Sequence, residues 1–382
     1  MTASLPPAQY IDDEERLRRL IDHLATESLL ALDTESNSLY AYRERVCLIQ
    51  LSTRTGDYII DPLALSAELL SPLGALLADP QIEKVFHAGE YDIICLKRDF
   101  GFAINNLFDT MIAARICGYP AIGLANLLSE YFEVKVDKRH QHDNWGARPL
   151  SDESLRYAQK DSHYLPALRD HLNRDLKRNG HLTEAHEIFE DATYVKDANH
   201  RAFDPDGFWR IGTPHSLTRQ QMAILRELYL LRDRIARRRD LPVFKIFSNR
   251  VLVSVAEASP RSLKDLRSIR GMSPVQIRRY GKRILQAVER GRASPLPDPP
   301  RHQPPDPVVT ERYAALHTWR KERAQQRGVE SDVIVSKDTL WTLAHRVPTS
   351  LDEMQSIRGL GPWRMETYGP ELLDVLMGAI SE

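Results

Sequence analysis

The stretch Leu29-Leu30-Ala31-Leu32-Asp33-Thr34-Glu35 joins an apolar run to two carboxylates. An apolar run of this length, followed by a polar Ser/Asn cluster, predicts a buried strand that ends in a loop. Residues i and i+2 of a strand point to the same face, so Asp33 and Glu35 should project side by side. Two carboxylates this close repel each other unless a cation lies between them, and Mg²⁺ and Mn²⁺ prefer such oxygen ligands. The pair by itself is also compatible with two solvated acids at the end of a strand.

The flanking sequence predicts an α/β domain with a mixed sheet. Residues 45–51 and 57–60 are β-rich runs joined by Ser-Thr-Arg-Thr-Gly, which predicts a hairpin, so three consecutive strands, the first carrying the carboxylates, should form an antiparallel meander. A short strand at 84–87 and a strand-like run at 107–110 then alternate with helices. We expect helices over residues 11–26, 63–77 (with Pro72 as an interruption or boundary), from 90 onward, 111–116, 124–132 and 151–173.

Composition limits the class of protein. The chain has 382 residues and is 42% hydrophobic, which suits two or three ordinary globular domains. Three cysteines, odd in number and set in apolar surroundings, indicate a reduced compartment and argue against a disulfide framework or a zinc site. No apolar run approaches the roughly 20 residues of a membrane span, and residues 1–10 lack the pattern of a signal peptide. We expect a soluble cytoplasmic protein without a membrane partner.

The net charge of −1 hides a strong division along the chain. Residues 1–214 contain 23 Lys and Arg against 34 Asp and Glu, which gives −11. Residues 215–293 contain 19 against 6, which gives +13, and residues 294–382 contain 10 against 13, which gives −3. An acidic body with a basic appendage is what a metal-dependent enzyme acting on a polyanion needs.

The basic region begins an internal duplication. Ser268-Ile269-Arg270-Gly271 recurs as Ser356-Ile357-Arg358-Gly359, and further matches keep the same offset of 88 residues over more than 50 positions without a gap. A unit of 88 residues is too long for a solenoid repeat, so the pattern predicts two small helical domains. We place an α/β domain at 1–210, the two helical domains at 214–293 and 308–382, and a proline-rich linker between these at 294–307.

Two further elements complete a set of acids. Asp92 lies at the expected start of the helix that follows the strand at 84–87, and Tyr157 and Asp161 are one turn apart on one face of the helix predicted at 151–173. Together with Asp33 and Glu35, three separate segments supply four acids and one phenol. Hydrolysis of a phosphodiester by two metal ions about 3.5–4 Å apart requires shared carboxylates of this kind.

These motifs identify a resemblance. The D-x-E pair, the helix aspartate and the Y-x-x-x-D motif resemble the DEDDy class of 3′-to-5′ exonucleases, which have an RNase H-like fold. The duplicated module resembles the HRDC domain, and an exonuclease domain followed by two HRDC domains is similar to the ribonuclease D family over nearly the whole chain. The stretches at 108–110 and 143–151 also match. A sister class has histidine where this chain has Tyr157.

The resemblance implies a site with two divalent ions, Mg²⁺ or Mn²⁺. Asp33, Glu35 and Asp161 would ligate the nucleophile-side ion, and Asp33 would bridge to the second ion, which Asp92 would hold directly or through water. Tyr157 would position the attacking water, and Glu35 would also approach the terminal 3′-hydroxyl.

The implied substrate is RNA with a free 3′ end. The family trims tRNA precursors and other structured RNAs one nucleotide at a time and releases nucleoside 5′-monophosphates. The acids do not discriminate ribose from deoxyribose, so a 3′-to-5′ DNA exonuclease is one alternative. An inactive nucleic-acid-binding adaptor is another, and the sequence leaves the oligomeric state open.

Several polar residues near these motifs have two interpretations. His87 and Arg148 would each contact a phosphate, or else be a buried histidine and an ion-paired arginine. Asp109 is expected to fix the local backbone rather than bind metal, and Trp145 to pack rather than stack on a base.

The charge of +13 on 79 residues exceeds what solubility requires, so we expect the first helical domain to bind phosphates. We expect the copies to differ in role, with the first gripping RNA and the second packing, shaping access or contributing little. The candidate contacts, besides His87 and Arg148, are Arg237, Arg238, Arg239, Lys245, Arg278, Arg279 and Lys282.

Overall fold

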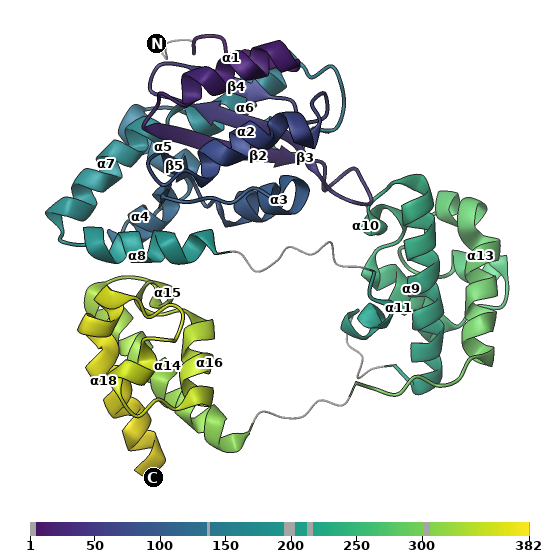
Figure 1. Ribbon diagram of the computed structural model, residues 1–382. Coiled ribbons are helices and arrows are strands. Elements are labelled where there is room, and N and C mark those ends of the chain that lie inside the picture. The colour runs from purple at the N-terminus through teal and green to yellow at the C-terminus, as the bar shows by residue number, and fades with distance from the viewer. Residues whose placement is uncertain (1–4, 136–137, 195–202, 212–216, 301–305, 382) are drawn as a thin grey trace. The chain divides into compact units, whose positions relative to one another are not determined.

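The computed structural model describes residues 5–135, 138–194, 203–211, 217–300 and 306–381 (Figure 1). The chain divides into two compact units. The first unit contains the N-terminal α/β domain together with the second helical domain, and comprises residues 1–36, 46–198 and 304–382. The second unit contains the first helical domain and a loop of the N-terminal domain, residues 199–303 and 37–45.

A six-stranded mixed sheet forms the centre of the α/β domain, in the order β1-β4-β3-β2-β5-β6. The predicted meander is confirmed, because β3 is antiparallel to both β2 and β4. β5 and β6 extend the sheet as parallel strands beside β2, and β1 pairs in parallel with β4 at the other edge. The strands are β1 Gln9–Ile11, β2 Leu29–Ser36, β3 Val46–Ser52, β4 Asp57–Ile60, β5 Glu83–Phe86 and β6 Leu107–Asp109. β1 was not predicted, since three residues are too few to show a strand pattern.

Helices cover the sheet, and the central strand β2 is buried at its start and opens at its end. Leu30, Ala31 and Leu32 are fully buried, whereas the four residues from Asp33 to Ser36 are half-buried. The helices of this domain are α1 Glu14–Leu24, α2 Ala67–Ala78, α3 Glu90–Phe100, α4 Thr110–Ile116, α5 Leu124–Phe132, α6 Asp152–His163, α7 Leu165–Arg178 and α8 Leu182–Thr193, with a 3₁₀ turn η1 at Lys138–His140.

Two helix predictions were wrong in their boundaries. The helix expected at 63–77 begins at Ala67, after the N-cap Ser66, and continues through Pro72. Pro72 lies in the second turn of α2, where its missing N–H removes one intrahelical hydrogen bond, the one that would reach the Glu68 carbonyl. The single helix expected at 151–173 is two helices that meet at Tyr164, with Pro166 in the first turn of α7, a position that suits proline.

Each helical domain has its own apolar core, and the duplication is visible in its contacts. The buried Arg232 donates to the Phe247 carbonyl at 3.1 Å, and Arg320, 88 residues later, donates to the Val335 carbonyl at 3.0 Å. The first domain contains α9 Arg219–Arg239, α10 Val243–Ile246, α11 Asn249–Ala258, α12 Leu263–Arg267 and α13 Pro274–Ala293, preceded by the 3₁₀ turn η2 Pro205–Arg210. The second contains α14 Pro307–Arg327, α15 Ser331–Ile334, α16 Lys337–Arg346, α17 Leu351–Met354 and α18 Pro362–Ser381.

The predicted linker at 294–307 lies partly outside the described residues, and its last residue already belongs to α14. Among the helices of the described residues, none combines the length and apolarity that a membrane crossing requires.

Candidate active site

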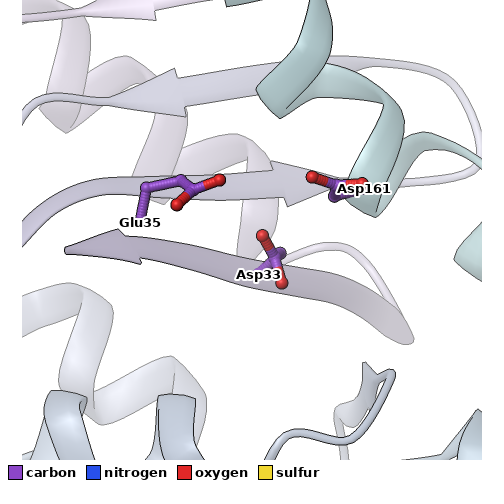
Figure 2. Close-up of side chains that lie close together, drawn as sticks. All are labelled: Asp33, Glu35 and Asp161. Atoms are coloured by element: carbon purple, nitrogen blue, oxygen red, sulfur yellow. The ribbon is translucent and has the colours of Figure 1, made fainter. Parts of the chain in front are cut away.

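Three carboxylates meet where β2 and α6 come together. Asp33 and Glu35 extend from the same face of β2, and Asp161 lies in the last turns of α6 (Figure 2). One ligand oxygen from each residue lies within 4.8 Å of the others. The i, i+2 spacing on the strand therefore has the predicted effect, and the distant helix supplies the third acid.

Asp92 lies close to this group but is held separately. It sits in the first turn of α3 and is 9% exposed. Its Oδ1 accepts hydrogen bonds from the backbone N–H of Thr34 at 3.0 Å and from the Thr34 hydroxyl. Asp92 is therefore tied to the strand residue between Asp33 and Glu35, and it is not among the three acids whose oxygens lie within 4.8 Å.

Burial raises the pKa of all four acids, and repulsion by neighbouring acids of the group adds to the shift at Asp33, Glu35 and Asp161. Burial raises the pKa of Asp33 well above its ordinary value, and the charges of Asp92, Asp161 and Glu35 raise it further. The same causes, burial first, raise the pKa of Glu35 to about 9 and that of Asp161 to about 7. Burial also raises the pKa of Asp92, to about 6, against hydrogen bonds from Thr34. Oxygen ligands that repel each other in a half-buried site fit hard divalent cations.

Tyr157 lies one turn before Asp161 on α6 and stacks on Trp145, with ring centroids 6.1 Å apart. Burial raises its pKa, and the charges of Asp161, Glu35 and Asp33 add to the shift. The phenol therefore remains protonated at neutral pH and faces the acids as a hydrogen-bonding group rather than as a base.

A buried aspartate that sequence reasoning missed holds α6 against the sheet. Asp57 of β4 accepts hydrogen bonds from Ser52 at 2.7 Å and Gln159 at 2.7 Å, and its Oδ2 lies 2.8 Å from His163 Nδ1. Burial opposes the shift, but these hydrogen bonds leave the pKa of Asp57 lowered. The Ser52 and Ser162 hydroxyls are also hydrogen-bonded to each other. The sequence offered one signal for this contact. Asp57 lies in a predicted strand and His163 in a predicted helix, and an acid and a histidine at such positions can pair.

Asp109, His87 and Trp145 have structural contacts. Asp109 accepts hydrogen bonds from the backbone N–H groups of Ala88, Gly89, Met111 and Ile112 at 2.8–3.1 Å, so it fixes the backbone before α3 and α4. His87 Nδ1 lies 2.9 Å from the Thr110 hydroxyl, and burial lowers its pKa. Trp145 is 1% exposed. A neutral histidine and a buried indole do not present charge or a free face to RNA.

Arg148 makes the ion pair that was the alternative to phosphate contact. Its guanidinium donates to both oxygens of Asp61, at 2.6 and 2.7 Å, and to the carbonyls of Cys47, Trp145 and Ala147. Because all five N–H donors are directed at these acceptors, none remains for a phosphate. Arg148 therefore connects the segment before α6 to β3 and to Asp61, the residue that follows β4.

The remaining candidate contacts belong to the first helical domain. Arg237, Arg238 and Arg239 form the last turn of α9, and three further cations lie on α13. All of these side chains are exposed, and none forms an ion pair within the described part of the chain. Lys245 lies over the Tyr40 ring, 4.1 Å from its centroid. The α13 residues are Arg278, Arg279 and Lys282.

Comparisons with known proteins agree with the fold and the domain content. A family model described as a 3′-5′ exonuclease matches residues 8–177, and the HRDC domain model matches residues 221–288 and 309–376. Ribonuclease D of Escherichia coli is 30% identical over 96% of this chain and 98% of its own length. Ribonuclease D of Acidiphilium cryptum is 30% identical over 99% of this chain and 95% of its own length.

The solved structures show the same relationship. The crystal structure of E. coli RNase D matches with a TM-score of 0.69 and 29% identity, and the match covers 98% of this chain and 99% of that one. The fold and the domain content therefore agree with the resemblance drawn from the sequence motifs. The chain belongs to the ribonuclease D family and is a metal-dependent exoribonuclease that hydrolyses RNA from its 3′ end.

Proposed function

We propose that the enzyme trims the 3′ ends of tRNA precursors and other structured RNAs and releases nucleoside 5′-monophosphates. The observation that carries this proposal is the group of three carboxylates within 4.8 Å on β2 and α6. The E. coli relative is described as an exoribonuclease involved in structured RNA processing. We also propose a cytoplasmic location, since the odd number of cysteines and their apolar surroundings suit a reduced compartment.

Asp33, Glu35 and Asp161 would hold one divalent cation, Mg²⁺ or Mn²⁺, and Asp33 and Asp92 would hold a second. When bound, the two ions would lower the pKa of a water molecule and stabilise charge on the leaving oxygen. The raised pKa values support this assignment, because the acids retain protons until cations replace them.

The protein's own groups orient the reactants. Tyr157 would accept or donate a hydrogen bond to the attacking water as a neutral phenol, and Glu35 would also approach the terminal 3′-hydroxyl. Asp57 keeps α6 in place through His163 and Gln159, so it determines where Tyr157 and Asp161 lie relative to β2.

The first helical domain would bind the RNA backbone. Its charge of +13 on residues 215–293 supports this role, as do Arg237, Arg238 and Arg239, which are exposed and form no ion pair within the described residues. An oligoanion attracted to this domain would be retained during successive cleavages.

The direct test uses purified protein with 3′-extended tRNA, single-stranded RNA and single-stranded DNA of matched sequence. With Mn²⁺, we expect stepwise shortening of both RNAs and release of mononucleotides, with DNA cleaved more slowly. Asp33→Asn serves as the matched inactive control. Equal rates on RNA and DNA, or failure to shorten the extended tRNA, would contradict the proposed substrate.

A further inference from the structure

The two helical domains share a pair of side chains at equivalent positions. In the first domain, Arg239 donates through Nη1 to the Tyr280 hydroxyl. In the second domain, Arg327 donates through Nη1 to the Tyr368 hydroxyl at 2.9 Å. Both members are offset by 88 residues, so the duplication has preserved the same arginine–tyrosine pair at the same place in each fold.

In the second domain this pair binds a carboxylate. Arg327 donates to both oxygens of Glu184 on α8, at 2.6 and 2.9 Å, and Glu184 is fully buried. Bidentate pairing of this kind is the strongest form of arginine–anion contact. The arginine–tyrosine pair of the second domain is therefore an occupied anion site.

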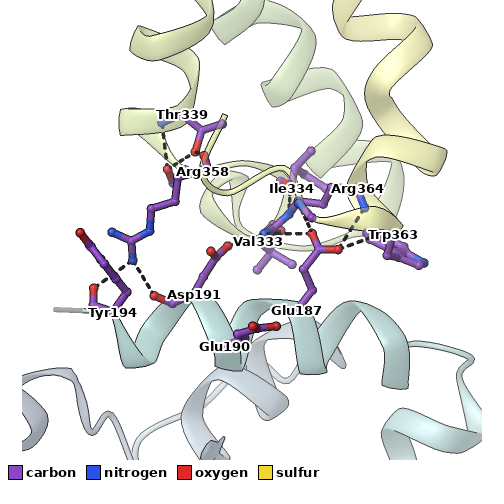
Figure 3. Close-up of polar contacts among 12 residues, drawn as sticks. Glu187, Glu190, Asp191, Tyr194, Val333, Ile334, Thr339, Arg358, Trp363 and Arg364 are labelled. Carbon is purple, nitrogen blue, oxygen red and sulfur yellow. Dashed lines mark hydrogen bonds and ion pairs between the residues drawn. The ribbon is translucent and has the colours of Figure 1, made fainter. Parts of the chain in front are cut away.

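Neighbouring contacts extend the same face along α8 (Figure 3). Glu187 accepts hydrogen bonds from the backbone N–H groups of Gly361 at 3.0 Å and Trp363 at 2.9 Å, at the start of α18. Arg358 donates to the carbonyls of Asp191 and Tyr194, and its guanidinium lies over the Tyr194 ring. Two carboxylates of α8, from Glu184 and Glu187, and two backbone carbonyls at its C-terminal end thus contact the second domain.

The equivalent face of the first domain has no such occupant within the described residues. Arg239 and Arg270, the counterparts of Arg327 and Arg358, are exposed and form no ion pair there. Ser273, the counterpart of Gly361, caps α13 with its own hydroxyl, which accepts from Gln276 N at 3.2 Å. The arginines, and not the helix N-terminus, are the groups left to bind an anion.

We propose that the first helical domain binds RNA phosphates through this face, with Arg239 on one phosphate and Arg270 on another. In the second domain the Glu184 carboxylate occupies the place beside Arg327, and the carbonyls of Asp191 and Tyr194 occupy the place beside Arg358; phosphates would take the equivalent places in the first domain. This inference rests on the proposed binding of RNA by the basic domain, and it names the residues that do so. It also explains why the second domain needs no excess of positive charge.

The test compares single substitutions that remove the same charge. Arg239→Gln and Arg270→Gln remove the proposed contacts, and Arg261→Gln is the control, because its counterpart Thr349 hydrogen-bonds only within its own domain. Binding of a 3′-extended tRNA to the full-length protein is measured across a salt series. We expect Arg239→Gln and Arg270→Gln each to weaken binding roughly three- to tenfold and to reduce the log–log salt slope by about one, with Arg261→Gln within about twofold of wild type.

Arg327→Gln gives the matched comparison in the second domain. It should leave RNA affinity within about twofold of wild type, while the thermal midpoint falls because Glu184 loses its buried partner. The Arg270 side chain is exposed and forms no hydrogen bond or ion pair within the described residues, so its variant remains informative if Arg239→Gln is unstable. Equal weakening by Arg261→Gln, or no weakening by either face variant, would overturn the assignment of this face. Failure of the wild-type protein to bind RNA would instead refute the proposed function.

Discussion

The acids of the N-terminal domain and the arginines of the first helical domain both gather charges of one sign, but they differ in burial. Asp33, Glu35 and Asp161 are half-buried and their pKa values are raised. Arg238 and Arg278 are exposed. Buried anions require cations in direct contact and are weakly screened, whereas exposed cations act over about 10 Å at 0.1 M salt. The first group should therefore control the rate of hydrolysis, and the second the binding of RNA.

The largest effect should follow removal of one acid. Asp161→Asn keeps the shape of the side chain but removes a charge from the three-carboxylate group, so we expect kcat to fall by about 10³ or more. RNA affinity should stay within about twofold of wild type, which is measured by filter binding. EDTA should abolish wild-type activity and Mn²⁺ should restore it. Activity that persists in EDTA would contradict the assignment of hydrolysis to a metal site formed by these acids.

Added salt should weaken the binding of RNA by the first helical domain. If five cations of the first helical domain each neutralise one phosphate, affinity for single-stranded RNA should fall about 100-fold between 50 and 200 mM salt. The value of kcat at saturating RNA should change little, because the acids are buried. A dissociation constant that does not change with salt would contradict the RNA-binding role assigned to the arginines.

Tyr157→Phe should have a smaller effect, confined to the chemical step. It removes one hydroxyl, whose pKa is raised by burial and by the charges of Asp161 and Glu35, but leaves the stacking on Trp145 in place. Loss of a single hydrogen bond to the attacking water predicts a fall in kcat of roughly 10- to 100-fold. Single-turnover rates and RNA affinity are measured together, and a loss of affinity without a loss of rate would contradict the assigned role.

The smallest effect concerns stability and pH. The folded-state pKa values of the four acids lie above those of an unfolded chain, so the folded protein retains protons that the unfolded chain releases. The stabilisation that results is present at low pH and is lost as the pH rises through about 6, 7 and 9, the values for Asp92, Asp161 and Glu35.

In EDTA the thermal midpoint should therefore fall by a few degrees between pH 6 and 9. Mn²⁺ should raise the midpoint more at pH 9 than at pH 6, because fewer protons compete for the oxygens. Asp33→Asn, with one acid fewer, should show a weaker dependence on pH. If the thermal midpoint of Asp33→Asn depends on pH as steeply as that of the wild-type protein, groups other than these acids cause the effect.

Most of the fold around the acids was predictable from local patterns. The meander of β2, β3 and β4 follows from β-rich runs and a short turn, and the capped start of α6 follows from Ser151 and its acidic first turn. The break at Tyr164 was missed because Pro166 fits either the interior of a long helix that it would kink or the first turn of a new one. The role of Arg148 stayed open until its acceptors were known.

The sequence by itself determined the identity of the acids, the spacing of Tyr157 and Asp161, and the duplication, because each depends only on residue types at fixed separations. The tertiary structure alone decided how Asp92 meets Thr34, how Asp57 holds His163, and how Glu187 meets Gly361. These contacts join residues 58, 106 and 174 positions apart. Contacts at such separations depend on how all the intervening elements pack, and no local pattern encodes that packing.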